Sequence, residues 1–501
     1  MPIVEVPQHS VGLSLQVSRS FETKICTSRP WKSGQPQRYF CQKSAVSAHI
    51  VCDHIFEGSK GGKMAIKKTR LHIIVVGAGL AGISAAISCA LAGHSVTVLE
   101  AAKELAEVGA GLQVTPNGSR LLRIWDLPQT LWDQAAEPTQ LTVHRYSGAV
   151  LAREVDFDKN IRRKYGVPFV DLHRGDLQQG LYQRAQQLGV KFHLNARVQS
   201  VDPAVPSLTT LSGHQYHADL IVGADGLWSR TRECFLGTAD PPKPTGDLAY
   251  RIVLSLDQIK QSPLRDWVSH PEVHFWIGPR SHAVGYSLKA GKMYNLVLLV
   301  PDDLPPGVTK QPGNVEEMKL LFEGWDPVLT QLLGYVDRVD KWKLMHREEL
   351  PSWINEAHNF VLIGDSCHPM LPYLAQGANS SMEDGAALGT ILKSVTRKEQ
   401  LPNALHTFEK LRKLRSEAIA RETFKQRNDF HMPDGPDQEA RDKIFTSQLG
   451  KEITGAFPSR WTCPVVQPWI YGYDAIAEAE KALRGKGFLT IEELLSQEEI
   501  V

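Results

Sequence analysis

The sequence has no long apolar segment. In its 501 residues there is no run of 18 or more consecutive apolar residues, which is the length that a membrane-spanning helix needs. We therefore expect no transmembrane segment. Hydrophobic residues make up 42% of the chain and charged residues 22%, a balance typical of a globular protein with a buried core.

The sequence contains few cysteines and carries no large excess of positive or negative charge. The seven cysteines form no C-x-x-C pair, which favours a reduced intracellular protein over a disulfide scaffold and predicts no metal site. The formal net charge is +1. A dedicated binder of nucleic acid or of an anionic membrane would carry a basic excess, so the sequence predicts neither.

Acidic residues are almost absent from the N-terminal region, where Glu22 is the single acidic residue between Val11 and Val51. Mitochondrial presequences share this shortage, but no Arg-rich amphipathic helix accompanies it here. We expect residues 1–69 to be a disordered or non-native extension, with Met64 as the natural start. The expected location is cytoplasmic, and mitochondrial targeting by residues 1–63 is the alternative.

What the chain does contain is a strand–helix–strand pattern over Leu71–Glu100. An apolar run ends in a G-x-G-x-x-G motif at Gly77, Gly79 and Gly82, and a second apolar run ends in Glu100. The first glycine permits a tight turn, the second lets a pyrophosphate approach the backbone, and the third lets the helix pack on the sheet. Glu100 stands where a ribose-binding carboxylate is expected. The pattern predicts a dinucleotide site; the alternative is a glycine-rich packing turn.

Two later segments repeat the combination of an apolar strand, a glycine and an acid. Leu220–Arg232 contains Asp225 after a strand, and Phe360–Gly377 contains Asp365 after another. Ligands of open α/β sheets bind at the carboxyl ends of strands, so the three strand ends could surround one extended ligand. Asp365 could accept hydrogen bonds from ligand hydroxyls. For Asp225 the alternative is a plain Asp-Gly turn.

The remaining pattern predicts a second sheet and several helices. Apolar and aromatic residues alternate over residues 245–300, which indicates mostly antiparallel strands. Other expected elements are a Gly-rich loop followed by a helix over Val108–Leu122, strands at Lys191–Val198 and Gln215–Gly223, a loop at Pro301–Gly313, and helices over Asn314–Leu333, Ser380–Ser394 and Asn403–Asn428.

The three motifs, GAGLAG with Glu100, GADGLWSRTR and GDSCHPMLPYLAQGANSSMEDGAALG, resemble in their order the signatures of class A FAD-dependent aromatic monooxygenases. The similarity is greatest to the salicylate hydroxylase-like, fungal-type group and covers roughly residues 70–480. It implies an α/β fold with a Rossmann-like FAD-binding domain from residues 70–240 and 351–430. It also implies an inserted antiparallel β-sheet substrate domain at 241–350 and a C-terminal helical or irregular extension at 431–501.

The resemblance also implies roles for individual residues. Arg251 would face the substrate and serve catalysis, and its alternative is a strand-edge charge. Arg174 would reach the FAD phosphates, and its alternative is a surface ion pair. The other expected FAD-binding residues are Gly77, Gly79, Gly82 and Glu100 for the ADP half, Gly111 near the flavin, Asp225 at the second strand end, and Asp365, Gly377 and Ala378 for the ribityl chain and ring.

The implied activity is hydroxylation of a phenolic or aromatic-acid substrate by a flavin hydroperoxide, with O2 and with NADPH or NADH as cosubstrate. It would belong to secondary metabolism or aromatic catabolism. The single G-x-G-x-x-G motif fits a family without a separate NAD(P)H domain. The expected partners are a small aromatic molecule and O2, with no nucleic acid or metal, in a monomer or homodimer. The alternatives are a flavin-dependent epoxidase or polyketide or terpenoid tailoring oxygenase, and an inactive nucleotide-binding scaffold.

Overall fold

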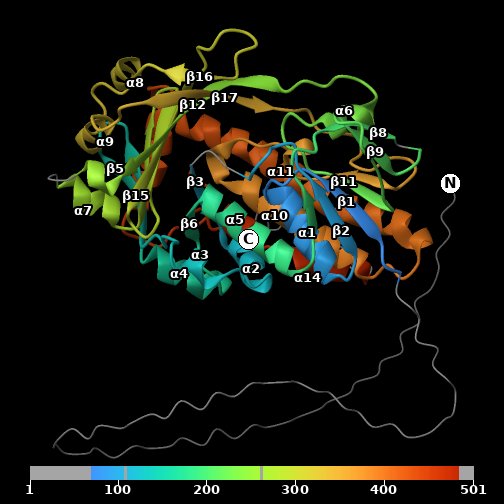
Figure 1. The fold of residues 1–501 in the computed structure, drawn as a ribbon. Coiled ribbons are helices and arrows are strands. Elements are labelled where there is room, and N and C mark those ends of the chain that lie inside the picture. Colours follow the sequence, from blue (N-terminus) through green and yellow to red (C-terminus); the bar gives the residue numbers. More distant parts are fainter. Residues whose placement is uncertain (1–68, 106–109, 203, 260–262, 485–501) are drawn as a thin grey trace, which may run out of the picture. The chain divides into compact units, whose positions relative to one another are not determined.

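The computed structural model describes residues 69–105, 110–202, 204–259 and 263–484. The expectations for residues 1–68 and 485–501, and for the start of the loop at Val108, lie outside the described residues. In the described part, a five-stranded sheet and an eight-stranded sheet form the two main layers, with α10 between them (Figure 1).

The five-stranded sheet is parallel throughout and has the order β18-β11-β1-β2-β7. The central strand carries Ile73, Ile74 and Val75, which have no exposed surface. Strands of parallel sheets are covered on both faces and therefore read as continuous apolar runs. The bounds are β1 His72–Val76, β2 Ser95–Leu99, β7 Lys191–His193, β11 Leu220–Gly223 and β18 Phe360–Leu362.

Two helices beside this sheet pack against each other at close range. Helix α1 (Leu80–Leu91) packs against α10 (Gln376–Leu392). A Cβ at Gly385 would lie 2.5 Å from the backbone nitrogen of Ala85, and one at Gly389 would lie 2.4 Å from the Cβ of Ser88. The glycines are therefore needed for the approach of the two helices. Helix α10 also begins four residues earlier than the predicted start at Ser380.

The eight-stranded sheet has the order β16-β17-β12-β15-β14-β13-β4-β5 and is antiparallel except for the β13–β4 pair. Strand β4 and the edge strand β5 precede residue 241, so the sheet also draws on residues outside 241–350. The bounds are β4 Gln140–Arg145, β5 Val150–Val155, β12 Lys243–Ser255, β13 Glu272–Gly278, β14 Ser281–Leu288, β15 Met293–Pro301, β16 Lys310–Gly313 and β17 Val339–His346.

Three predicted elements are divided in the structure. The strand expected at Lys191–Val198 ends at His193 as β7, and Val198 begins a strand of a different sheet. The helix expected over Asn314–Leu333 is two helices, because Asp326 caps a new helix whose first residue is Pro327, a position that proline favours. The strand expected at Gln215–Gly223 is β10 (Gln215–His217) and β11, which belong to different sheets.

Smaller sheets and helices complete the described residues. A three-stranded sheet joins β8 (Val198–Asp202), β9 (Ser207–Thr210) and β10, and a two-stranded sheet joins β3 (Gly111–Val114) and β6 (Val170–His173). The helices are α2 Pro116–Ile124, α3 Gln129–Trp132, α4 Phe157–Tyr165, α5 Arg174–Gln187, α6 Arg230–Leu236, α7 Leu264–Ser269, α8 Val315–Leu321 and α9 Pro327–Leu333. The 3-10 turns are η1 Leu256–Gln258, η2 Gly364–Ser366, η3 Pro372–Leu374 and η4 Lys398–Gln400.

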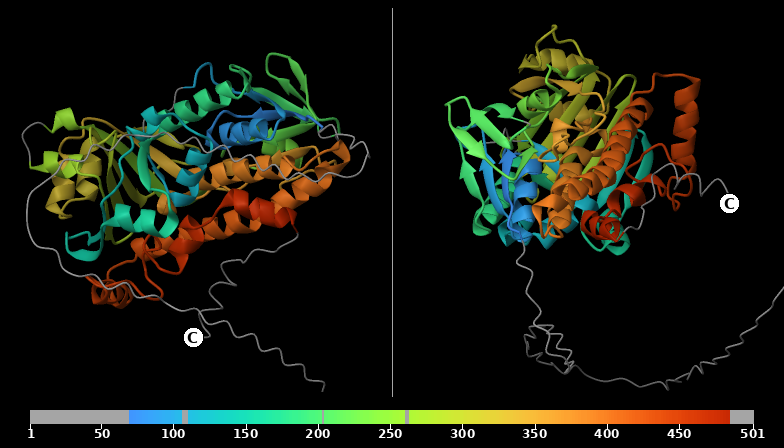
Figure 2. Two further views of the ribbon diagram at one scale, coloured as in Figure 1. Left: turned by 90° about the horizontal axis from the view of Figure 1, so that it is seen from below. Right: turned by 90° about the vertical axis from the view of Figure 1, so that its right-hand side faces the viewer.

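The C-terminal helices run along one side of both sheets, drawn in orange and red in Figure 2. They are α11 Leu401–Phe430, α12 Pro436–Ser447, α13 Val466–Tyr471 and α14 Ala475–Leu483. Helix α11 is amphipathic as predicted, with Leu405, Phe408 and Leu411 fully buried. Among the described residues no helix has the length and apolar character needed to cross a membrane.

Candidate active site

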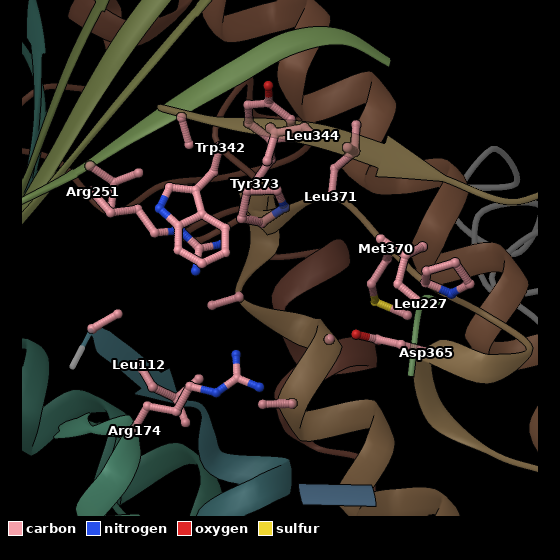
Figure 3. Close-up of a pocket in the computed structure, with 18 of the residues that line it drawn as sticks. Leu112, Arg174, Leu227, Arg251, Trp342, Leu344, Asp365, Met370, Leu371 and Tyr373 are labelled. Carbon is pink, nitrogen blue, oxygen red and sulfur yellow. The ribbon is translucent and has the colours of Figure 1, made fainter. Parts of the chain in front are cut away.

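A cavity of about 500 Å³ lies where the carboxyl ends of the parallel strands meet the eight-stranded sheet (Figure 3). It brings together predicted site residues that are far apart in the chain. Seven of them line it, namely Gly79, Gly111, Arg174, Arg251, Asp365, Gly377 and Ala378. The other four are not among the lining residues: Gly77, Glu100 and Asp225 come just after strands of the parallel sheet, and Gly82 lies in the first turn of α1.

The first strand end is shaped by two glycines behind the cavity. Gly77 has φ +103°, and a Cβ there would lie 2.5 Å from the carbonyl oxygen of Ala224. At Gly82 a Cβ would lie 2.0 Å from the carbonyl oxygen of Gly77. Both positions thus need glycine for the turn itself. The turn places Gly79 at the cavity as the cap residue of α1, where a helix N-terminus favours anions.

Glu100 holds the glycine-rich turn. Its Oε2 accepts a hydrogen bond from the backbone nitrogen of Ala78 at 2.7 Å, and its Oε1 accepts one from Ala102 at 2.7 Å. The carboxylate therefore lies at the end of β2 beside the first strand end, which is where the sequence pattern placed it.

The Asp225 side chain turns toward the start of α6. Its carboxylate accepts hydrogen bonds from the Ser229 hydroxyl at 2.5 Å and from the Thr231 backbone nitrogen at 2.9 Å. The cavity is lined instead by its neighbours Ala224 and Gly226. Asp225 thus fixes the loop between β11 and α6, and the backbone beside it meets the cavity.

Asp365 and Arg174 point toward the cavity from opposite sides (Figure 3). Desolvation by the surrounding protein raises the pKa of Asp365, although His368 and Arg174 oppose the rise. Arg174 is the first residue of α5, and its backbone nitrogen donates to the carbonyl oxygen of Ala110 at 3.0 Å. This bond ties the base of α5 to the residue that precedes Gly111.

The first turn of α10 also faces the cavity. The first N–H groups of a helix have no acceptor within the helix, so those of Gly377 and Ala378 can serve an anionic group. Gln376 fixes this turn: its amide nitrogen donates to the Thr115 hydroxyl at 3.0 Å, and its amide oxygen accepts from Asn117 at 3.0 Å.

The opposite end of the cavity is aromatic and cationic. Arg251 on β12 lies with its guanidinium carbon 5.0 Å from the ring centre of Trp342, and Lys310 lies with its Nζ 4.2 Å from the same centre. All three residues line the cavity. An aromatic face flanked by cations suits a planar anionic ligand.

Comparisons with known proteins settle the family. A family model described as "FAD binding domain" matches residues 70–423. The chain is also 50% identical over 419 residues to "FAD-dependent monooxygenase OpS4" of Beauveria bassiana, which covers 82% of this chain and 97% of that protein. The chain belongs to the FAD-dependent monooxygenases. The predicted family, enzyme class and cofactor are thereby confirmed.

More distant relatives of this monooxygenase agree with the assigned family and with the fold. The "3-hydroxybenzoate 6-hydroxylase" of Polaromonas naphthalenivorans is 28% identical over 409 residues, covering 81% of this chain and 96% of that protein. A solved structure described as a salicylate hydroxylase substrate complex has a TM-score of 0.67 at 21% identity, covering 84% of this chain and 99% of that one. The predicted α/β fold class is confirmed.

The cavity of this monooxygenase fits FAD by its own features. An extended dinucleotide needs a stretch of backbone that it can approach without meeting side chains. It also needs helix N-termini near its phosphates. The cavity offers both. The space beside Gly79 is open, because a Cβ there would meet no atom within 4 Å, and the N-termini of α1 and α10 line the cavity. Among the residues that the structure describes, no group of three or more His, Cys, Asp and Glu side chains could hold a metal.

Sequence reasoning missed a buried ionic network beneath the cavity of the monooxygenase. His368 Nε2 lies 2.5 Å from Asp384 Oδ2, and Arg412 donates to Asp384 Oδ1 at 2.8 Å. Arg412 also pairs with Glu383 at 2.7 Å, and Arg415 pairs with Glu383 at 3.0 Å. The sequence signal that could have revealed this network is the acidic pair Glu383-Asp384, in the middle of a helix whose other residues are mostly small or apolar.

The charges in this network stabilise one another. Burial alone would raise the pKa of Asp384 and of Glu383, but the facing cations hold both below their ordinary values. Burial alone would lower the pKa of His368, but Asp384 raises it above the ordinary value. Because Asp384 also accepts from the backbone nitrogen of Gly364 at 2.9 Å, the network fixes the strand end that carries Asp365.

Proposed function

We propose that this monooxygenase hydroxylates an electron-rich aromatic acid or phenol, with NADPH or NADH as electron donor and O2 as oxygen source. The observation that carries the proposal is the single cavity that joins the glycine-rich strand ends to the aromatic, cationic face of the eight-stranded sheet. The chemistry of the relatives supports it, since "3-hydroxybenzoate 6-hydroxylase" names a hydroxylated aromatic acid.

The strand ends would hold FAD, which when bound supplies hydride acceptance and transfer of one oxygen atom from O2. Gly77, Gly79 and Gly82 shape the approach for the ADP half, with Glu100 at the ribose end. Arg174 would meet the phosphate region. The carboxyl of Asp365 would bind the ribityl hydroxyls. It can form hydrogen bonds with hydroxyl groups whether it is protonated or ionised. The first turn of α10 at Gly377 and Ala378 would face the ring, near Gly111.

The end of the cavity beside the eight-stranded sheet would orient the substrate and exclude water. The lining there includes the buried apolar side chains of Phe275, Leu299 and Leu344, which limit the entry of water to the reacting centre. Arg251 would hold a substrate carboxylate or phenolate by a charge-assisted hydrogen bond. A phenolate is more electron-rich than a phenol, so this contact favours attack on the ring.

The test begins with the purified full-length protein. We expect a flavin absorption spectrum and oxidation of NADPH or NADH that is faster with salicylate, 3-hydroxybenzoate or another phenolic acid than without. Under isotopically labelled O2, the product should contain one labelled oxygen atom. Benzoate lacks the activating hydroxyl and is the matched control, for which we expect no oxygenated product.

Two outcomes would contradict the proposal. A protein that binds no added FAD would remove the flavin chemistry altogether. A flavoprotein that transfers labelled oxygen to alkenes but to no phenolic compound would instead be an epoxidase.

A further inference from the structure

A row of four directly paired residues forms the floor of the cavity beside the eight-stranded sheet. Arg251 on β12 pairs with Val297 on β15. Val297 in turn pairs with Val284 on β14, and Val284 pairs with Phe275 on β13. All four residues line the cavity. Because directly opposite residues of antiparallel strands share one face of a sheet, the floor runs straight across four strands, with a cation at one end and an aromatic ring at the other.

This row gives the floor a defined length. Neighbouring strands lie about 4.8 Å apart, so three spacings place the Cα atoms of Arg251 and Phe275 about 14 Å from each other. Val284 and Val297 are partly exposed although they belong to central strands, which means that the cavity lies over the middle of the row. A ring bound over these two valines, with its carboxylate at Arg251, would direct its para substituent toward Phe275.

A residue of the C-terminal segment closes the far end of the row. Trp461 lines the cavity and is 3% exposed, and its ring centre lies 5.2 Å from that of Phe275. Among the described residues after α11, 431–484, it is the single one that lines the cavity. It also lies beyond residues 70–423, which the family model matches. The C-terminal segment therefore contributes to the active site through this one side chain.

Trp461 is held so that its ring cannot swing aside. Its indole nitrogen donates to the carbonyl oxygen of Tyr373 at 3.1 Å, and its own carbonyl oxygen accepts from Gln467 at 2.6 Å. The preceding residue is tied to α11, since Nε of Arg460 donates to Glu422 at 2.7 Å. Because both the backbone and the ring are fixed in a close-packed interior, a ligand does not gain room by displacing Trp461.

We propose that Trp461 is a specificity-determining residue, which limits the length of the substituent opposite the acid group of the substrate. Together with Phe275 it forms an apolar corner that accepts a short apolar group and rejects a longer one. The inference rests on the proposed function, because it takes Arg251 as the contact for the acid group. It narrows the substrate class to phenolic acids with at most a short apolar group para to the carboxylate.

The corner selects by shape, because it offers no free polar atom. The indole nitrogen of Trp461 is engaged with Tyr373, and Phe275 has no polar side-chain atom. An apolar pocket distinguishes substituents that differ by one methylene about 10-fold to 200-fold, and methylenes added to a filled space force strain. We therefore expect a steep dependence of substrate binding on chain length, with FAD content unaffected.

The test uses two short substrate series and the FAD-loaded full-length enzyme. Salicylate and 3-hydroxybenzoate are the parent acids, and each is compared with its derivatives that carry a methyl or a propyl group para to the carboxylate. The dissociation constant comes from the change in flavin absorbance, and kcat/KM comes from the oxygenated product. In wild type we expect the propyl compound to bind at least about tenfold more weakly than its parent.

Trp461→Leu removes the ring that the longer chain would meet. We expect it to improve binding of the propyl compound relative to its parent at least about tenfold. The ratio of the two dissociation constants does not depend on the fraction of folded enzyme, so a merely structural loss does not move it. Phe275→Leu opens the same corner from the sheet and should shift the ratio in the same direction, which decides the question if the Trp461 variant does not fold.

Trp276→Leu is the matched control. Trp276 is the neighbour of Phe275 on β13, is fully buried, and donates from its indole nitrogen to Asp326 at 2.7 Å. It does not line the cavity. This variant should lower the stability of the protein without changing the ratio of dissociation constants.

The size limit is overturned by equal binding of the propyl compound and its parent in wild type, or by an equal shift of the ratio in Trp276→Leu. It is also overturned by an unchanged ratio in Phe275→Leu or in a folded Trp461→Leu, and by a wild type that binds no member of either series. In the first three cases oxygenation of a parent acid leaves the proposed function standing. A series that binds with the expected limit but is not oxygenated contradicts the proposed function and not the limit.

Discussion

Arg415 and Glu383 form a bidentate ion pair that joins α11 to α10. Nε and Nη2 of Arg415 lie 3.0 Å from the two carboxylate oxygens of Glu383, and both side chains are buried. The same guanidinium donates to the carbonyl oxygens of Trp469 and Ile470 at 2.9 and 3.1 Å. One side chain thus fastens the C-terminal segment, which lies beyond the matched residues 70–423, to the helix whose first turn lines the active site.

This relationship predicts that Arg415→Met destabilises the protein strongly. Removing one partner leaves Glu383 as a buried charge with less compensation, which typically costs about 3–5 kcal/mol. We expect a loss of that order in the free energy of unfolding by urea, together with lower FAD content. The control is Arg421→Met, since Arg421 pairs with Glu349 on the surface, where both side chains are about half exposed. That change should cost less than about 1 kcal/mol, and a similar cost for the two variants would contradict the prediction.

A second prediction concerns the turn at Gly77. Gly77 and Gly93 both have positive φ values, +103° and +95°, but only at Gly77 would a Cβ meet other atoms, 2.5 Å from the Ala224 carbonyl oxygen. Both alanine variants share the backbone cost. Gly77→Ala should cost about 1–3 kcal/mol more and should raise the dissociation constant of FAD. Urea unfolding and FAD titration check this, and equal stability of the two variants would show that the turn tolerates the side chain.

Much of the fold could be predicted because its signals are local. The first strand, its glycine turn and the following helix are contiguous in the sequence, and apolar runs reveal buried parallel strands directly. The division of Asn314–Leu333 could also have been read locally, since Asp326-Pro327 is a cap followed by a residue that starts helices.

The partners of individual side chains could not be predicted in the same way. Asp225 was expected to bind the cofactor; in the structure its carboxylate accepts hydrogen bonds from Ser229, the cap residue of α6, and from Thr231 in the first turn of α6. The pairing of Glu383 with Arg415 spans 32 positions and depends on how two helices pack. Sequence periodicity predicts which face of a helix is buried, and it carries no information about which buried charge meets which.

Buried neutral histidines predict a loss of stability on mild acidification. Burial lowers the pKa of His144 from 6.5 to about 4, and the nearby His274 adds to this. The unfolded chain therefore binds a proton between these pH values while the folded one does not. The contribution of neutral His144 to the free energy of unfolding is complete above pH 6.5 and is lost as the pH falls toward 4. It amounts to about 3 kcal/mol for a pKa shift of this size.

The measurement is the free energy of unfolding between pH 7.5 and 4 for wild type and for His144→Phe, in which residue 144 cannot titrate. We expect a shallower dependence in the variant over the range below pH 6.5. His406→Phe is the control because His406 is exposed, and its pH dependence should match that of wild type. Parallel curves for His144→Phe and wild type would mean that His144 does not contribute to the acid sensitivity.

Arg251 is predicted to select substrates that carry a negative charge. Its guanidinium lines the sheet end of the cavity beside Trp342, so Arg251→Ala removes a cation without removing any group at the FAD-binding strand ends. A charge-assisted hydrogen bond contributes about 1.5–3 kcal/mol. We therefore expect KM for a phenolic acid to rise about tenfold to a hundredfold, with FAD content retained. For a phenol without a carboxylate the rise in KM should be smaller, because that substrate binds as a neutral molecule and meets the arginine as an anion only after its proton has left.

Arg153→Ala is the matched control, since Arg153 is exposed on β5 of the same sheet and does not line the cavity. Steady-state kinetics with both substrate classes separates the roles: an equal loss for acids and neutral phenols would indicate that Arg251 shapes the pocket and does not read charge.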